Sequence, residues 1–220
     1  AVITVTTRDG ALSATIPVTV LPAPCTGEDC PSDIFTDAPA PNHWAHEGID
    51  FAIENGLFNG MSATTFAPET PMTRAMLVTV LWRYAGSPKE GENRFTDVKD
   101  GLWYTEAVSW AAEKGIVGGV GNHCFDPDGM ITREQLATIL YRYSKSIELD
   151  TTAQVDLNTF PDSAAVSPWA EAALSWAVAE GLINGLQDGD KAYLDPLGSA
   201  TRAQVATILM RYIRSQATQN

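Results

Sequence analysis

The chain has 220 residues, of which 45% are hydrophobic, and its 14 basic and 27 acidic side chains give a net charge of −13. Sequence-independent binding to nucleic acid needs clustered cations, and an acidic surface is repelled by anionic lipid, so the composition argues against both partners. The sequence contains no apolar run of about 18 residues, which predicts that no helix inserts into a membrane. The hydrophobic content is sufficient for a folded core.

The first twenty residues have a strand-like pattern. The chain begins with neither an initiator methionine nor a signal peptide, so we expect a fragment of a longer, exported protein. Residues 1–20 alternate apolar and polar side chains on both sides of Asp9-Gly10, a dipeptide typical of hairpin turns. Two strands alone are marginally stable in water. The segment resembles the last hairpin of a bacterial immunoglobulin-like domain.

Residues 21–32 are rich in proline and cysteine and are predicted to form a short, stiff linker. Cys25 and Cys30 are separated by four residues, and in an exported chain such a pair indicates a small disulfide loop. A zinc site is the alternative, but no second Cys/His pair follows at zinc-ligand spacing. The sequence therefore predicts a disulfide and neither a metal nor a cofactor.

From Asp33 onward the sequence repeats itself three times. Each unit has an aromatic residue and an aspartate, then a tryptophan six or seven residues later, then an amphipathic helix that ends at a glycine. A second glycine follows four residues after the first. The predicted units are residues 33–90, 91–150 and 151–214, followed by a tail, 215–220. The shared positions are Asp37, Asp97 and Asp162; Trp44, Trp103 and Trp169; and the second glycines Gly60, Gly119 and Gly185.

Each unit continues through an apolar-x-Pro turn into Thr-Arg and a second helix, whose apolar residues have helical spacing. The arginines of the three Thr-Arg pairs are Arg74, Arg133 and Arg202. A helix-loop-helix unit this short cannot bury its apolar face alone, whereas three units packed about a common axis can. We predict a mainly α fold, with three helix-loop-helix repeats in a pseudo-threefold spindle and a short N-terminal β-hairpin stub.

This ordered set of motifs resembles the S-layer homology family over residues 33–214. The resemblance implies a three-pronged helical spindle with grooves between neighbouring repeats. It also implies binding to a secondary cell-wall polysaccharide, often one that bears pyruvate ketals, at the surface of a Gram-positive cell. The arginine of the family's Thr-Arg-Ala-Glu motif lies in the grooves, which points to Arg74, Arg133 and Arg202. The glutamate of that motif is replaced here by Met76, Gln135 and Gln204.

The Thr-Arg segment also has a physical interpretation. Thr-x-x-Gln before an apolar helix is a capping box, which the first repeat lacks because Met76 cannot return the hydrogen bond. An arginine at the first helical position faces the positive end of the helix dipole, which is unfavourable for a cation. Free amides with a guanidinium would form a site for a carboxylate or phosphate. The alternative is an ion pair with an aspartate of a neighbouring repeat.

The other shared residues have two interpretations each. The tryptophans Trp44, Trp103 and Trp169 can stack on sugar rings or fill the core, whereas Trp82, Trp110 and Trp176 are predicted core residues. The aspartates can close turns or bind sugar, and the second glycines can permit positive φ or let a ligand approach. The histidines lack partners at metal-ligand spacing, and no nucleophile motif occurs.

These observations predict a non-catalytic, monomeric module that anchors a surface protein to an anionic cell-wall polysaccharide. The alternative is a structural repeat module that mediates protein or lattice contacts without binding glycan. An enzymatic interpretation would need a carboxylate pair, as in glycoside hydrolysis, and has the least support.

Overall fold

The computed structural model describes residues 2–6, 13–17, 30–89 and 91–219. Near the N-terminus, β1 (Val2–Thr6) and β2 (Ser13–Pro17) pair antiparallel, with Ile3 opposite Ile16. The antiparallel pairing predicted for this segment is therefore confirmed. The Asp9-Gly10 turn lies outside the described residues, and the relationship to an immunoglobulin-like domain stays a prediction.

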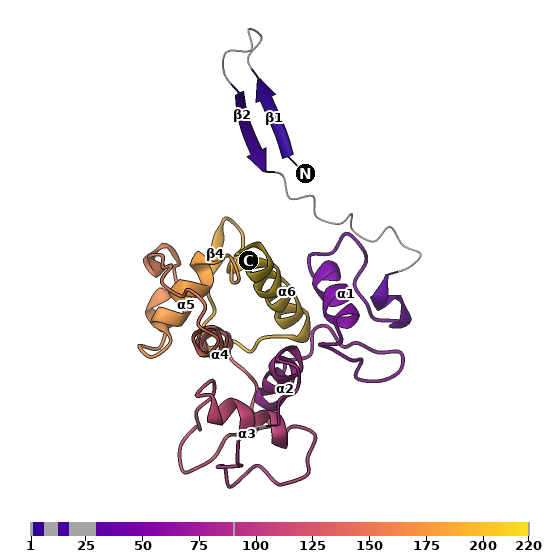
Figure 1. Cartoon of the computed structure of the whole chain (residues 1–220), viewed down its shortest axis with the longest axis vertical. Coiled ribbons are helices and arrows are strands. Elements are labelled where there is room, and N and C mark those ends of the chain that lie inside the picture. Colours follow the sequence, from indigo (N-terminus) through magenta and orange to yellow (C-terminus); the bar gives the residue numbers. More distant parts are fainter. Residues whose placement is uncertain (1, 7–12, 18–29, 90, 220) are drawn as a thin grey trace.

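The rest of the described chain is mainly helical, as predicted, with three prongs (Figure 1). The first helices of the three repeats are α1 (His46–Glu54), α3 (Thr105–Glu113) and α5 (Glu171–Ala179). The second helices are α2 (Arg74–Tyr84), α4 (Arg133–Ser146) and α6 (Arg202–Gln219). The short elements are the 3₁₀ turns η1 (Pro31–Ile34), η2 (Leu157–Thr159) and η3 (Ser163–Ala165), and the hairpin β3 (Leu186–Asp188) with β4 (Lys191–Tyr193). Among the described residues, none of the helices is long and apolar enough to span a bilayer.

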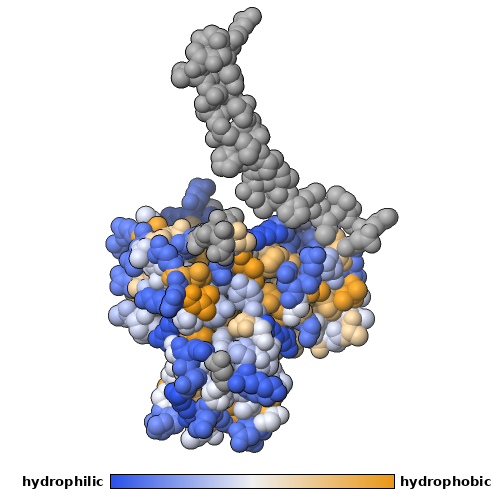
Figure 2. Space-filling model, viewed as in Figure 1, coloured by the Kyte–Doolittle hydropathy of each residue, from blue (hydrophilic) through white to orange (hydrophobic). Residues whose placement is uncertain are grey.

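The prongs are formed between repeats rather than within them. Helices α2, α4 and α6 lie at the centre, and α3, α5 and α1 pack against them from outside (Figure 1). Each outer helix packs on the second helix of the preceding repeat, so that α1 of the first repeat packs on α6 of the last. The three repeats therefore close into a ring. Figure 2 shows that the prong containing α3 is mostly hydrophilic on its visible face, whereas hydrophobic patches reach the surface of the other two.

Three equivalent tyrosines, one from each central helix, meet at the centre of the structure. The ring centroids of Tyr84, Tyr143 and Tyr212 lie 6.2 to 6.5 Å apart, a distance typical of favourable aromatic pairs. The Tyr212 hydroxyl hydrogen-bonds to Ser144 Oγ at 2.9 Å. Burial raises the pKa of Tyr143 to about 12, because the phenolate form would lose its hydration. The tyrosines therefore form a neutral, packed centre.

A ring of backbone hydrogen bonds joins the segments that lead into the central helices. Met72 N–H donates to the Ala200 carbonyl, Ala200 N–H to that of Ile131, and Ile131 N–H to that of Met72, each at 2.9 Å. All three residues are buried, so unpaired amides there would be costly. The ring satisfies them with one bond from each repeat.

The helix ends follow the sequence signals. Gly56, Gly115 and Gly181 have φ of 66°, 69° and 68°, the left-handed conformation that ends a helix. Thr132 and Gln135 form the predicted capping box, whereas the first repeat has only the bond from Met76 N–H to Thr73 Oγ1. The return hydrogen bond of the capping box is missing in the first repeat, as expected, and the weaker cap stays a prediction.

We predict that Tyr143→Ala lowers the free energy of unfolding by about 3–5 kcal/mol, the usual cost of truncating a buried aromatic side chain. Urea denaturation followed by circular dichroism measures this loss. Tyr193→Ala, at a half-buried strand position outside the tyrosine triangle, is the control and should cost less. Equal effects would contradict a packing role specific to the triangle.

Candidate functional site

The three motif aspartates each hold a turn of their own repeat. Asp97 accepts hydrogen bonds from Phe125 N–H and Asp126 N–H, both at 2.7 Å. Burial alone would raise the pKa of Asp97, but these two bonds and the nearby Arg74 guanidinium lower it overall. Asp37 binds Phe66 and Ala67 in the same way, and Asp162 binds Leu194 and Asp195. The aspartates are thus turn-closing residues that act across about thirty positions of sequence.

The turn that each aspartate binds has an unfavourable backbone conformation. Ala67, Asp126 and Asp195 have φ of 60°, 60° and 48°, which L-residues other than glycine rarely adopt. Because the two amides of each turn are bound by a carboxylate, the aspartate offsets this strain. We infer that the aspartates fix the position of the carbonyl that lies between the two bound amides.

That carbonyl is bound by an arginine of the preceding repeat. Arg74 Nε donates to the Phe125 carbonyl at 2.8 Å, and the equivalent bonds join Arg133 to Leu194 and Arg202 to Phe66. The three arginines are only 3–7% exposed. Burial lowers the pKa of Arg202 to about 10, so the guanidinium remains charged at neutral pH. Arginine and aspartate thus bind one turn from two repeats, an arrangement we call the clasp.

The predicted anion site of free helix amides is wrong. Arg74 N–H donates to the Gly129 carbonyl and Ala75 N–H to that of Pro127, so the amides at the start of α2 bind the neighbouring repeat. The amides at the starts of α4 and α6 are used in the same way. The alternative was an ion pair between this arginine and an aspartate of a neighbouring repeat. Among the described residues the two side chains make no direct bond; both bind the same turn instead.

Three grooves open beside the clasps, and each combines residues of all three repeats. We name them by the second arginine in each: the Arg142 groove, the Arg211 groove and the Arg83 groove. Their volumes are 320, 510 and 140 Å³. The equivalent residues are Arg74, Gly119, Gln135, Arg142 and Trp169 in the first; Arg133, Gly185, Gln204, Arg211 and Trp44 in the second; and Arg202, Gly60, Met76, Arg83 and Trp103 in the third.

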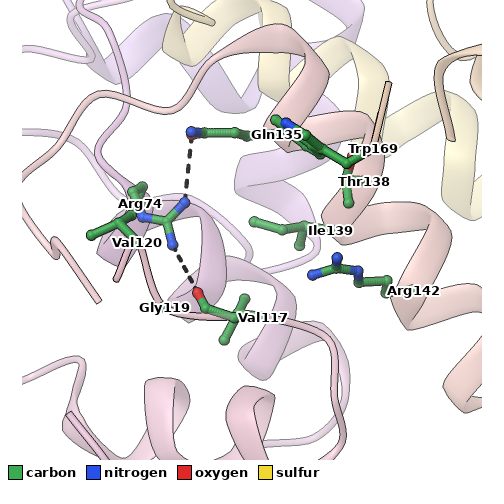
Figure 3. Close-up of a pocket in the computed structure, with 10 residues that line it drawn as sticks. Arg74, Val117, Gly119, Val120, Gln135, Thr138, Ile139, Arg142 and Trp169 are labelled. Carbon is green, nitrogen blue, oxygen red and sulfur yellow. Dashed lines mark hydrogen bonds between the residues drawn. The ribbon is translucent and has the colours of Figure 1, made fainter. Parts of the chain in front are cut away.

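The Arg142 groove shows how these residues are arranged (Figure 3). Arg74 Nη2 donates to the Gly118 carbonyl at 3.2 Å, and Arg74 Nη1 lies 3.5 Å from Gln135 Oε1. Gln135 Oε1 also accepts the N–H of Thr132, so the helix cap contacts the groove. Arg142 is exposed and makes no hydrogen bond or ion pair within the part of the chain that the structure describes. Its guanidinium is therefore available to an anion.

Sequence reasoning missed Arg83, Arg142 and Arg211. They follow the Thr-Arg arginines by the same interval in every repeat, which is a signal that the repeat alignment contains. Arg83 and Arg211 each donate to a carbonyl just beyond the end of an outer helix, that of Leu57 at 3.3 Å and that of Leu182 at 3.1 Å. The second arginines are thus partly structural in two grooves, whereas in the third Arg142 has no hydrogen-bond or ion-pair partner among the described residues.

The motif tryptophans and the second glycines line the three grooves. Trp44, Trp103 and Trp169 are 54–59% exposed at the groove edges, whereas Trp110 and Trp176 are buried. A Cβ on Gly60 would lie 2.3 Å from the Phe35 ring, and one on Gly119 would lie 2.7 Å from the Cys124 carbonyl oxygen and 3.2 Å from the Phe95 ring. The second glycines therefore leave room for the motif aromatic ring and for nearby backbone carbonyls, and among the three only Gly185 has positive φ, at 81°.

We predict that Asp97→Asn lowers the free energy of unfolding by about 1–2 kcal/mol, because one of two charge-assisted bonds is lost. The pKa of Asp97 is lowered by folding, so its contribution is complete above the unfolded-state value of about 4 and is lost as the pH falls through the folded-state value. Denaturant unfolding between pH 7 and pH 2 measures both effects. Asp128→Asn, at an exposed position, is the control and should be as acid-sensitive as the wild type. An Asp97→Asn variant that is equally acid-sensitive would contradict the clasp.

The sequence is similar to that of known proteins along most of its length. The sequence profile described as S-layer homology domain matches residues 35–75, 94–137 and 159–206. The chain is 32% identical over 78% of its length to a surface-layer 125 kDa protein of Lysinibacillus sphaericus, and 30% identical over 76% to exoglucanase XynX of Acetivibrio thermocellus. It is 28% identical over 70% to a cellulosome-anchoring protein of the latter species. The chain spans 14%, 15% and 35% of these relatives' own lengths.

Proposed function

The chain belongs to the S-layer homology domain family, and on that premise we propose that it is a non-catalytic module that anchors a larger protein to the bacterial cell wall. Its ligand is an anionic secondary cell-wall polysaccharide whose sugars can carry pyruvate ketals. Relatives named as a surface-layer protein and a cellulosome-anchoring protein support a location at the cell surface. The module acts as a monomer, since its symmetry is internal.

The observation that carries this proposal is the meeting of two arginines and an exposed tryptophan in one groove. A guanidinium binds a carboxylate or phosphate through paired N–H donors, and an indole face packs on a sugar ring. A polymer with an acidic substituent on its sugar offers both partners. The net charge of −13 does not prevent this contact, since long-range repulsion is screened beyond about 8 Å at physiological ionic strength.

The three grooves differ in their capacity for a ligand. Small-molecule sites usually have volumes of about 300–1,000 Å³, a range that includes the Arg142 and Arg211 grooves but not the 140 Å³ Arg83 groove. The Arg83 groove also contains Met76 where the other two have glutamine. We therefore assign glycan binding to the Arg142 and Arg211 grooves.

The groove linings support a binding role without catalysis. Glycoside hydrolysis uses a pair of carboxylates that flank the scissile bond. Among the described residues that line the three grooves there is neither aspartate nor glutamate. The second candidate function, a structural repeat without a glycan ligand, is favoured by the clasps, because they give the Thr-Arg arginines a role in assembly.

Sedimentation with purified Gram-positive cell-wall sacculi tests the proposed function. The chain is mixed with sacculi before and after acid extraction of the secondary polymer, and the bound fraction is measured. We expect binding to intact sacculi and its loss after extraction. A chain that remains in the supernatant with sacculi carrying an acidic, pyruvylated polymer would favour the structural alternative.

We predict that Arg142→Ala and Arg211→Ala each weaken wall binding by roughly tenfold to a hundredfold, because a charge-assisted bond to the ligand contributes about 1.5–3 kcal/mol. Arg83→Ala is a matched control from the equivalent position of the narrow groove and should bind as the wild type does. Circular dichroism confirms that each variant is folded. Equal losses in all three variants would contradict the assignment of the ligand to two grooves.

A further inference from the structure

A second cluster of reactive side chains lies outside the grooves, where the chain joins the first repeat. Cys30 immediately precedes η1, and His46 and Asp50 lie one turn apart on one face of α1. All three are buried, with 5%, 2% and 7% of their surfaces exposed. A thiol, an imidazole and a carboxylate are the three side-chain types that bind zinc.

The distances from His46 to the other two side chains fit a tetrahedral metal. His46 Nε2 lies 3.4 Å from Cys30 Sγ and 3.1 Å from Asp50 Oδ2, and the three ligand atoms lie within 4.8 Å of one another. Zinc bonds of about 2.3 Å to sulfur and about 2.0 Å to nitrogen or oxygen give tetrahedral edges of about 3.5 Å and about 3.3 Å. The two nitrogen-centred distances agree with these edges.

The surrounding hydrogen bonds orient the ligands. His46 Nδ1 lies 2.8 Å from the Pro39 carbonyl, which can only accept, so Nδ1 carries a proton and Nε2 of the neutral ring points its lone pair at the other two ligands. Asp50 Oδ1 accepts the N–H of Ser32 at 2.9 Å. Asp50 Oδ2 is buried and, within the described chain, makes no hydrogen bond, although it lies within ion-pair distance of Nε2. A buried carboxylate oxygen needs a cation, which a zinc ion shared with Cys30 Sγ would supply in place of a protonated His46.

The arrangement does not fit a nucleophilic enzyme. In a Cys-His-Asp triad the carboxylate orients the imidazole through one nitrogen and the thiol contacts the other. Here Cys30 and Asp50 both approach Nε2, and Nδ1 is occupied by Pro39. The three side chains are also buried, so a substrate could not reach the sulfur.

We propose that Cys30, His46 and Asp50 bind a zinc ion that fastens η1 to α1. A thiolate and a carboxylate together carry two negative charges, which Zn²⁺ neutralises, so the buried cluster has no net charge when it is occupied. The three protein ligands leave one tetrahedral position for a further donor. The sequence did not predict this site, because Cys30 and His46 are far apart in sequence and belong to no paired motif. A zinc-bound Cys30 could not also form the predicted disulfide with Cys25; because Cys25 lies outside the described residues, that pairing stays a prediction.

Metal titration of the reduced chain tests this proposal. Zinc binding is measured by competition with a chromophoric chelator, and Co²⁺ is used as a spectroscopic probe. We expect one zinc per chain, a thiolate-to-cobalt charge-transfer band with the visible bands of a tetrahedral site, and a rise in unfolding temperature that EDTA reverses. The cobalt spectrum is read on the wild type, so it does not depend on a variant that folds.

Cys30→Ser and His46→Gln should weaken zinc affinity by at least about 100-fold, since loss of an outer-shell partner alone typically costs 10- to 100-fold. Cys124→Ser and His123→Gln are matched controls that remove a cysteine and a histidine elsewhere and should bind as the wild type does. A reduced wild type without zinc affinity, unchanged binding in Cys30→Ser, or a Cys25–Cys30 disulfide in the untreated protein together with a failure to bind zinc after reduction would overturn the proposal. Wall binding is a separate measurement, so either result stands without the other.

Discussion

The architecture depends on the clasp, in which one short turn is bound by charged side chains from two repeats. Asp97 binds the amides of the turn and Arg74 binds its carbonyl, so the same peptide links the second repeat to the first. The turn thereby keeps a left-handed residue that would otherwise be strained. Because the contact is repeated at each junction, short helices that have little stability alone share one continuous core.

The same interaction sets the chemistry of the grooves. The Nε atom of each clasp arginine is committed to a neighbouring carbonyl, so only its Nη atoms can face the groove. Most of the freely available charge in the Arg142 groove therefore comes from Arg142 rather than from Arg74. Small substitutions at equivalent positions, such as Met76 for glutamine, then make three related grooves unequal in size and polarity.

Local features were predictable from the sequence and contacts between repeats were not. The glycines after the outer helices, the capping box at Thr132 and the helical periodicity depend on neighbours along the chain, so their structures agreed with prediction. The binding of the helix amides by another repeat depends on how the ring closes, which spacing does not reveal. Arg142 was missed for a related reason, because an arginine near the end of an amphipathic helix resembles any solvated cation until the groove is formed.

The closed ring also fixes the number of repeats. In an open solenoid, units can be gained or lost at the ends, and the remaining interfaces survive. Here Arg202 of the last repeat binds Phe66 of the first, so each repeat has two neighbours and none is terminal. Each groove takes its arginines, glycine and tryptophan from three different repeats, and a two-repeat chain would contain no complete groove. Gain or loss of a single unit would therefore alter every groove at once, whereas a substitution such as Met76 for glutamine changes one groove and leaves the other two intact.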